Sequence, residues 1–226
     1  ETIGEDVPAL IRDYQDANTN NKDLPLFVFA STPSYCGSHI DGFHHAVLAT
    51  LSSMADNGKQ QTHINLLPGM VSPADMRYLH EIMQEFGIDA ILFPDYSKSL
   101  DNVFTHEYQL IPSGGTKIKD IRRTGTAKAT IEFGIVFAKA STRVRATKNT
   151  PTAGEWLQEN RYIRNFQMPL PIGINASDHF YNTLCKIGNK KMPEKFVEER
   201  GRLVDSYVDG HKYVFGKKVM IYGEED

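Results

Sequence analysis

Short apolar stretches and amphipathic stretches alternate along this chain, and that alternation limits the fold more than any other feature. Residues 26–30 form a continuous apolar run, which is typical of a strand buried on both faces. Residues 63–67 and 88–93 are two further predicted strands, and each is followed by a turn that contains proline. Repeated alternation of strands and helices predicts an α/β fold with a mostly parallel sheet flanked by helices.

Capping residues mark the predicted helix boundaries. Ser72 is a favourable N-cap, Pro73 suits the first helical position, and Gly87 supplies the left-handed residue that ends the helix. Further helices are predicted over residues 7–14, 41–54, 116–123, 177–187 and 193–213, with Thr116 as the cap of the helix that runs through Arg123. Further strands are predicted over residues 130–133 and 219–222. Helices therefore stand between most of the strands, as parallel pairing requires.

The composition excludes several classes of protein. The chain has 226 residues, of which 40% are hydrophobic, enough to bury a core without disulfides or metals. A net charge of −3 gives no footprint for nucleic-acid binding, and no apolar run approaches the ~20 residues of a membrane span. Two cysteines, Cys36 and Cys185, are too few for a disulfide framework. We therefore expect a soluble cytoplasmic chain with no nucleic-acid or membrane partner.

The loop of residues 31–39 is one of two places where side chains could carry chemistry. It holds Ser34, Cys36 and His39 directly after the apolar run of residues 26–30. Functional groups in open α/β sheets gather outside the carboxyl ends of the strands, which is where this loop is expected. A polar turn that only caps the following helix accounts for the same residues. The sequence has no phosphate-loop, dinucleotide, Cys-x-x-Cys or zinc-helix motif that would decide between these interpretations.

Asp205 and Asp209 form the second place where side chains could carry chemistry. They stand four residues apart on the predicted helix of residues 193–213 and therefore share one face. Two carboxylates placed in this way could bind a hard cation, which prefers oxygen ligands. Alternatively, Arg202 and Lys212, each three residues from one of them, pair with them on a solvated surface. Residue chemistry alone leaves both interpretations open.

Several blocks of the sequence resemble the nitrogenase molybdenum–iron protein β-subunit family. In chain order they are residues 32–42 (TPS-x-x-GSH-x-x-G), 65–69 (NLLPG), 94–97 (PDYS), 114–116 (GGT) and 199–205 (ERGRLVD), the last with Asp209, His211, Gly216 and Lys217. The resemblance covers nearly the whole chain and is weakest over residues 139–165. It implies Rossmann-like parallel sheets flanked by helices, within a multi-domain nitrogenase component 1 subunit.

The resemblance implies a role in electron transfer to dinitrogen. The β subunit of that family pairs with an α subunit in an α2β2 tetramer, and the two subunits share an 8Fe–7S P-cluster. Electrons come from an ATP-hydrolysing iron protein and pass through the P-cluster to an iron–molybdenum cofactor in the α subunit. Dinitrogen is reduced to ammonia there. The parent of this chain is therefore expected to be an oxidoreductase.

Three residues match sites of the family. Ser34 matches a serine whose oxygen binds an iron of the oxidised P-cluster, since an alkoxide becomes a better ligand as the iron becomes electron-poor. Asp205 and Asp209 match aspartates that help to bind a divalent cation between the two β subunits. The resemblance therefore favours the functional interpretation of both places.

The chain also departs from the family pattern. Cys36 and Cys185 match none of the family's cluster ligands, and the matching cysteines are expected to precede Glu1, as are the other ligands of the interface cation. We therefore expect an internal fragment that is inactive alone. Its expected divisions are the end of a cluster-binding α/β domain (1–58), a middle α/β domain with a long helix (59–216) and the first strand of a truncated domain (217–226).

Two related kinds of protein and one unrelated kind are the alternatives to a molybdenum–iron β subunit. The cofactor-assembly scaffold related to the β subunit shares the PD-x-S and GGT blocks, but an acidic or amide residue is expected there at the position of Ser34. The β chain of a vanadium or iron-only nitrogenase is also open, because the α subunit's pocket selects the metal. An α/β binding domain with no redox role would instead be a well-folded monomer that is indifferent to iron.

Overall fold

The computed structural model describes residues 5–33, 38–101, 103, 104, 106–110, 113–134, 150–220 and 222. Within them, four parallel strands form one sheet in the order β2-β1-β3-β4. The strands are β1 (Ile64–Leu67), β2 (Ala90–Leu92), β3 (Ala129–Phe133) and β4 (Arg164–Met168). The prediction of an α/β fold with a parallel sheet is confirmed.

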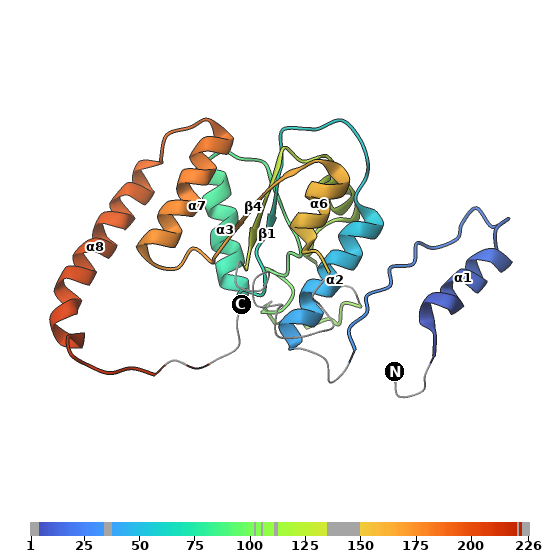
Figure 1. The fold of residues 1–226 in the computed structure, drawn as a ribbon, viewed down its shortest axis with the longest axis horizontal. Coiled ribbons are helices and arrows are strands. Elements are labelled where there is room, and N and C mark those ends of the chain that lie inside the picture. The colour runs from blue at the N-terminus through green and yellow to red at the C-terminus, as the bar shows by residue number, and fades with distance from the viewer. Residues whose placement is uncertain are drawn as a thin grey trace.

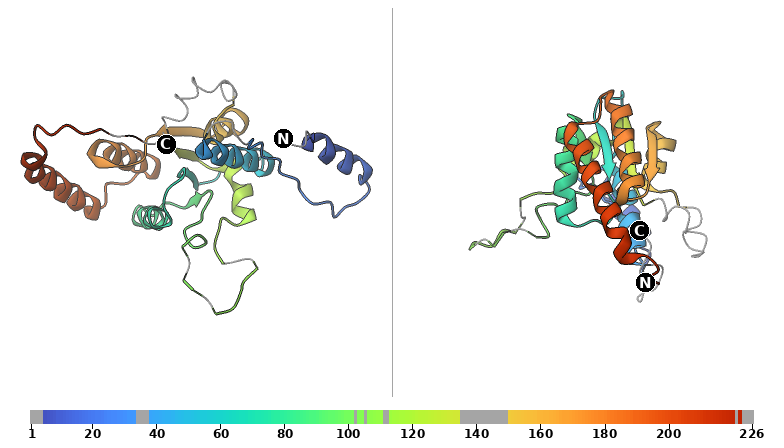
Figure 2. Two further views of the ribbon diagram at one scale, coloured as in Figure 1. Left: turned by 90° about the horizontal axis from the view of Figure 1, so that it is seen from below. Right: turned by 90° about the vertical axis from the view of Figure 1, so that its left-hand side faces the viewer.

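Helices cover both faces of this sheet (Figure 1). One face carries α3 (Pro73–Glu85), α7 (Gly173–Gly188) and α8 (Glu194–Val214), and the other carries α2 (His39–Met54), α4 (Ile118–Arg123) and α6 (Ala153–Arg161). The short 3-10 helix η1 (Thr124–Thr126) follows α4. The remaining helix, α1 (Val7–Ala17), has no buried residue and stands apart from these layers (Figure 2). None of the described helices is both long enough and apolar enough to cross a membrane.

A hydrophobic cluster fills the space on each side of the sheet. The cluster beneath α3 and α7 includes Phe86, Phe133 and Phe180, and α8 adds Phe196. The cluster beneath α2, α4 and α6 includes Leu51 of α2. Helix α2 therefore packs on the same sheet as the elements that follow it. The expected division of the chain at residue 58 stays a prediction.

The predicted start and end of α3 and the predicted start of α8 agree with the structure. The Ser72 hydroxyl accepts from the backbone N–H of Asp75 at the start of α3, and Gly87 has a φ of +55° just past its end. Helix α8 begins directly after Pro193, as predicted. These boundaries follow from local chemistry, because a capping hydroxyl or a left-handed glycine acts within a few residues.

Two predicted strands are wrong. Residues 26–30 have no partner strand among the described residues, and Leu26 and Phe29 are exposed. The aromatic ring of Phe27 instead contacts Tyr14 of α1, with ring centroids 5.5 Å apart. Of the residues 219–222, those described are exposed and form no strand. An apolar run forms a strand only where a neighbouring strand pairs with its backbone.

Candidate functional site

Sequence blocks far apart along the chain meet at the carboxyl ends of β1 and β2. The Tyr96 hydroxyl donates to the carbonyl of Val71 at 2.6 Å, which joins the PDYS block to the loop before α3. The Thr116 hydroxyl donates to the carbonyl of Leu92 at 2.7 Å and accepts from the N–H of Asp95 at 3.0 Å. The GGT block is therefore bonded to the end of β2. This corrects the prediction that Thr116 caps a helix.

The glycine pair before Thr116 is required by its conformation and its surroundings. Gly114 has a φ of +122° and Gly115 a φ of +80°, and residues other than glycine rarely adopt such positive φ angles. A Cβ at Gly114 would also lie 3.1 Å from Cβ of Lys98. Two glycines let this loop approach the segment that follows β2.

Asp95 joins the same loop to α3. Its Oδ2 lies 2.8 Å from Nε2 of His80, and its Oδ1 accepts from the N–H of Ser97 at 2.9 Å. Burial raises the pKa of Asp95, but the hydrogen bonds from His80 and Ser97 outweigh burial and lower that pKa to about 2. Asp95 is therefore a carboxylate at neutral pH.

Replacing His80 by leucine is expected to lower the free energy of unfolding by about 1 kcal/mol at pH 5, after a discount for the partial exposure of His80. The lowered pKa of Asp95 stabilises the folded chain at pH values above 3.8, the ordinary pKa of an aspartate, and this stabilisation is lost as the pH falls toward 2. The difference from the unmodified chain should therefore shrink with falling pH. Urea denaturation between pH 5 and pH 2 measures it. Gln84→Leu on the exposed face of α3 is the control, and an equal loss there would contradict the role of the His80–Asp95 bond.

A polar cavity of about 480 Å³ lies between α3 and this loop. Arg77 lines it, and its guanidinium is held in place by two hydrogen bonds of 2.9 Å to Asp101 and one of 2.6 Å to the carbonyl of Ser97. These bonds fix the loop. Within the described ranges, no three His, Cys, Asp or Glu side chains gather in a way that could hold a metal ion.

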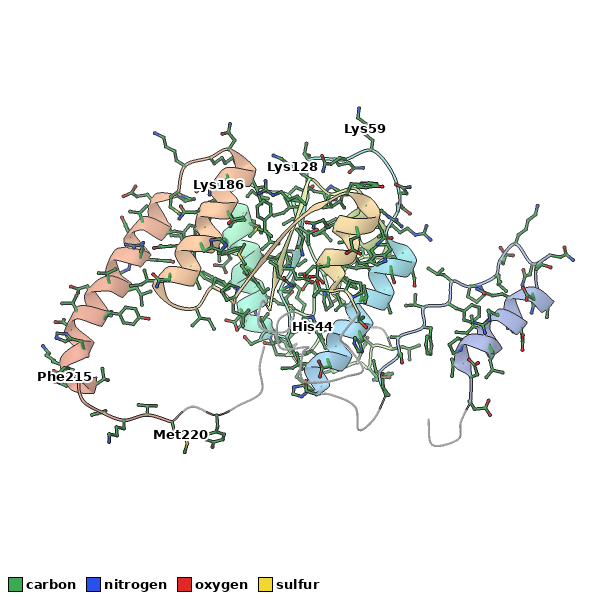
Figure 3. The ribbon with its side chains drawn as sticks, in the orientation of Figure 1. His44, Lys59, Lys128, Lys186, Phe215 and Met220 are labelled. Carbon is green, nitrogen blue, oxygen red and sulfur yellow. The ribbon has the colours of Figure 1, made fainter. Side chains whose placement is uncertain are left out.

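The sequence did not predict a buried acid at Glu132 on β3, which is 3% exposed. Its Oε2 accepts from the Thr152 hydroxyl at 2.6 Å and from Nδ2 of Asn165 at 3.0 Å, while Oε1 accepts from the N–H of Gly154 at 3.0 Å. Burial raises the pKa of Glu132 against these hydrogen bonds and the nearby His44. In Figure 3, His44 lies toward the opposite end of the strands from Lys59 and Lys128. Thr152 is the N-cap of α6, and the pattern Thr152-x-x-Glu155, a capping box, was the sequence signal available for the start of that helix.

Asp205 and Asp209 are both exposed on α8. Nζ of Lys212 lies 3.9 Å from Oδ1 of Asp209, which agrees with one predicted pair. Arg202 instead lies 3.5 Å from Glu198, so the predicted pairing of Arg202 with Asp205 is wrong. A Glu four residues before an Arg is the favourable order on a helix.

The other predicted site residue, Ser34, lies outside the described residues, as does Cys36. The nearby Ser38 caps α2 in a reciprocal pair with Asp41, so the end of this loop does serve as a helix cap. Cys185 lies half-buried on α7, and burial raises the pKa of its thiol. Iron–sulfur clusters need thiolate ligands, and a raised pKa disfavours the thiolate. The described part of the chain therefore does not fit such a cluster by itself.

The whole sequence matches one family model, described as nitrogenase component 1 type oxidoreductase, over residues 1–226. This chain belongs to that family. The nitrogenase molybdenum-iron protein beta chain of Clostridium pasteurianum is 34% identical over 227 residues, which are 100% of this chain and 47% of that protein. A solved structure of nitrogenase Cp1 at pH 6.5 is 34% identical, with a TM-score of 0.81, and covers 96% of this chain and 44% of that one.

Relatives with other names also match this member of the nitrogenase component 1 family. The vanadium-iron protein beta chain of Trichormus variabilis is 29% identical over 100% of this chain and 47% of that protein. The iron-molybdenum cofactor biosynthesis protein NifN of Bradyrhizobium diazoefficiens is 29% identical over 100% of this chain and 46% of that protein. The chain thus spans less than half the length of these relatives, and the family match covers several kinds of subunit.

Proposed function

We propose that this chain is part of the β subunit of a molybdenum–iron nitrogenase component 1. The 34% identity to the molybdenum-iron protein beta chain of Clostridium pasteurianum, over the whole of this chain, carries the proposal; the vanadium-iron beta chain and NifN relatives are 29% identical. The β subunit would pair with an α subunit and receive electrons from an ATP-hydrolysing iron protein. The bound P-cluster would relay these electrons toward the iron–molybdenum cofactor of the α subunit, where dinitrogen is reduced to ammonia.

Ser34 is the residue of this chain that we assign to the P-cluster. Its hydroxyl would bind an iron of the oxidised cluster, and the cysteine ligands would come from outside residues 1–226. The support is the TPS-x-x-GSH-x-x-G block around Ser34.

Asp205 and Asp209 are assigned to a divalent cation between two copies of the β subunit. Both carboxylates are exposed, and Asp209 has only a long contact to Lys212, so oxygen atoms remain for a hard cation. Tyr207 and Val208 on the same part of α8 are large and exposed, as expected of a surface that another subunit covers.

Replacing Asp205 and Asp209 together by asparagine is expected to remove this cation and weaken the contact between β subunits. The amides keep the side-chain shape but lose the negative charge that attracts the cation. The measurement combines metal analysis with native mass spectrometry of the complete complex at low protein concentration. Loss of about one cation per β subunit is expected, because a two-fold contact contains each site twice, together with more dissociation.

The matched control is Glu194→Gln with Glu198→Gln, because these exposed acids have the same spacing on the same helix. The control should keep both the cation content and the assembly. Unchanged metal content in the aspartate variant would contradict the assignment of the two residues.

A cofactor-assembly scaffold is the second candidate, because NifN matches this chain over its full length. The vanadium-iron protein beta chain match leaves the metal of the partner subunit as a further alternative. Purification of the native complex, followed by metal analysis and an assay of ammonia formation with iron protein and ATP, distinguishes these. A scaffold would form no ammonia, and a vanadium complex would contain vanadium.

A further inference from the structure

A second, smaller cavity lies at the carboxyl ends of β3 and β4, on the face that α3 and α7 cover. Its volume is about 170 Å³. Leu79, Ile82 and Phe133 line its interior and are 5%, 2% and 1% exposed. Leu170 forms part of the wall, and Ile172 lies at the mouth, where it is 78% exposed. The cavity is therefore apolar inside and open at one end.

The position of this cavity in the sheet is one where α/β proteins bind ligands. The strand order places β2 and β3 on opposite sides of β1, so the chain reverses direction across the sheet at β1. Val71, in the loop between β1 and α3, lines the cavity together with Phe133 at the end of β3. Ligands of open α/β sheets bind outside the carboxyl ends of the strands at such a reversal.

The walls of the cavity favour an uncharged ring. Phe133 and Tyr181 supply aromatic surface, and the Tyr181 ring stacks on Phe196 with centroids 4.8 Å apart, so its orientation is fixed. The Tyr78 hydroxyl donates to Glu199 at 2.8 Å, and burial raises the pKa of Tyr78, which keeps it neutral. Among the described residues, Asp75 is the one charged residue that lines the cavity, and its negative charge disfavours an anion.

We propose that this cavity binds a small uncharged aromatic molecule of about the size of benzene or phenol. An enclosed apolar cavity of about 150 Å³ lined by Leu, Ile and Phe stays dry and binds benzene. This cavity has a similar volume and shares Leu, Ile and Phe as wall residues, but it is open at one end and two tyrosines and Asp75 also line it. Asp75 could also accept a hydrogen bond from a ring hydroxyl. The proposal does not depend on the proposed role in nitrogenase, because it rests on the described residues of this chain alone.

Fluorine NMR of ligands mixed with the purified chain tests this proposal. Fluorobenzene and 4-fluorophenol should show line broadening that saturates at millimolar concentration. 4-Fluorobenzoate, which has a similar ring and a negative charge, should bind at least tenfold more weakly. Equal binding of all three, or no binding to a chain whose circular dichroism shows it to be folded, would overturn the proposal.

Two variants place the binding in this cavity. Ile172→Trp at the mouth and Leu170→Trp in the wall should each weaken fluorobenzene binding at least tenfold. Ile172 is mostly exposed, so its replacement should leave the fold intact and decides the test even where Leu170→Trp fails to fold. Ile118→Trp, at an exposed residue of α4, is the matched control and should bind as the unmodified chain does. Unchanged binding to folded Ile172→Trp would also overturn the proposal.

Discussion

Replacing Glu132 by alanine is expected to lower the free energy of unfolding by roughly 2–4 kcal/mol at pH 7. The substitution leaves three donors without their acceptor: the buried hydroxyl of Thr152, the buried N–H of Gly154 and the partly buried side-chain amide of Asn165. Relief from burying the carboxylate offsets only part of that loss. Urea denaturation followed by the fluorescence of Trp156, the single tryptophan, measures the change next to the site.

Glu159→Ala is the matched control for this variant, because Glu159 is an exposed acid of α6. We expect a change within about 0.5 kcal/mol there, as for most surface substitutions. A loss of the same size in both variants would show that the bonds of Glu132 are not the cause.

Glu132→Gln gives the pH dependence of the same site. Burial raises the pKa of Glu132 in the folded chain above its ordinary value of 4.5. The raised pKa of Glu132 stabilises the folded chain at pH values below 4.5, and this stabilisation is lost as the pH rises through the pKa that Glu132 has in the folded chain. The unmodified chain should therefore lose stability relative to the glutamine variant as the pH rises above 4.5. A difference that changes in the opposite direction would contradict the effect of burial.

The parts of the fold that the sequence predicted are those determined by local chemistry or by burial on both faces. β1 and β3 are central strands with every residue buried, so their apolar character was visible. β4 was missed because it contains no continuous apolar run; its Asn165 and Gln167 alternate with Phe166 and Met168, which is the pattern of a strand with one polar face. Residues 26–30 show the converse, because apolar character does not reveal whether a partner strand is present.

The candidate site shows the same division. Resemblance singled out the PDYS and GGT blocks, and the structure joins them through Thr116 and Asp95. The sequence could not show that Thr116 bonds to Leu92 rather than capping a helix, because that choice depends on a residue 24 positions away. Glu132 was missed for the same reason, since its three donors come from β4 and the start of α6.

The placement of α8 relates the fold to the proposed subunit contact. Its first half is attached to the body of the chain, through the bond of Glu199 to Tyr78 and the paired bonds of Arg200 to Asp178 at 2.7 and 2.9 Å. Its second half carries Asp205 and Asp209 on exposed turns. A helix attached at one end can present the other end to a second subunit without disturbing the core.

Replacing Gly125 by alanine is expected to cost about 3 kcal/mol or more, at the upper end of the range for overpacked sites. A Cβ at Gly125 would lie 1.9 Å from the carbonyl oxygen of Asp56 and 2.9 Å from its backbone nitrogen. Backbone atoms cannot rotate away as a side chain can, and the N–H of Asp56 is itself bonded to the carbonyl of Arg122 at 2.8 Å. The two segments must therefore separate to admit a methyl group.

Gly201→Ala on α8 is the matched control, since no described atom beyond the adjacent residues and the backbone of its own helix lies within 4 Å of the added Cβ. Alanine favours a helix over glycine, so this variant should gain roughly 0.5–1 kcal/mol in the same urea titration. A loss below about 1 kcal/mol for Gly125→Ala would mean that η1 can move away from Asp56 at little cost. The bond from Nδ2 of Asn65 to the carbonyl of Thr124, 2.9 Å long, would then not hold η1 rigidly against β1.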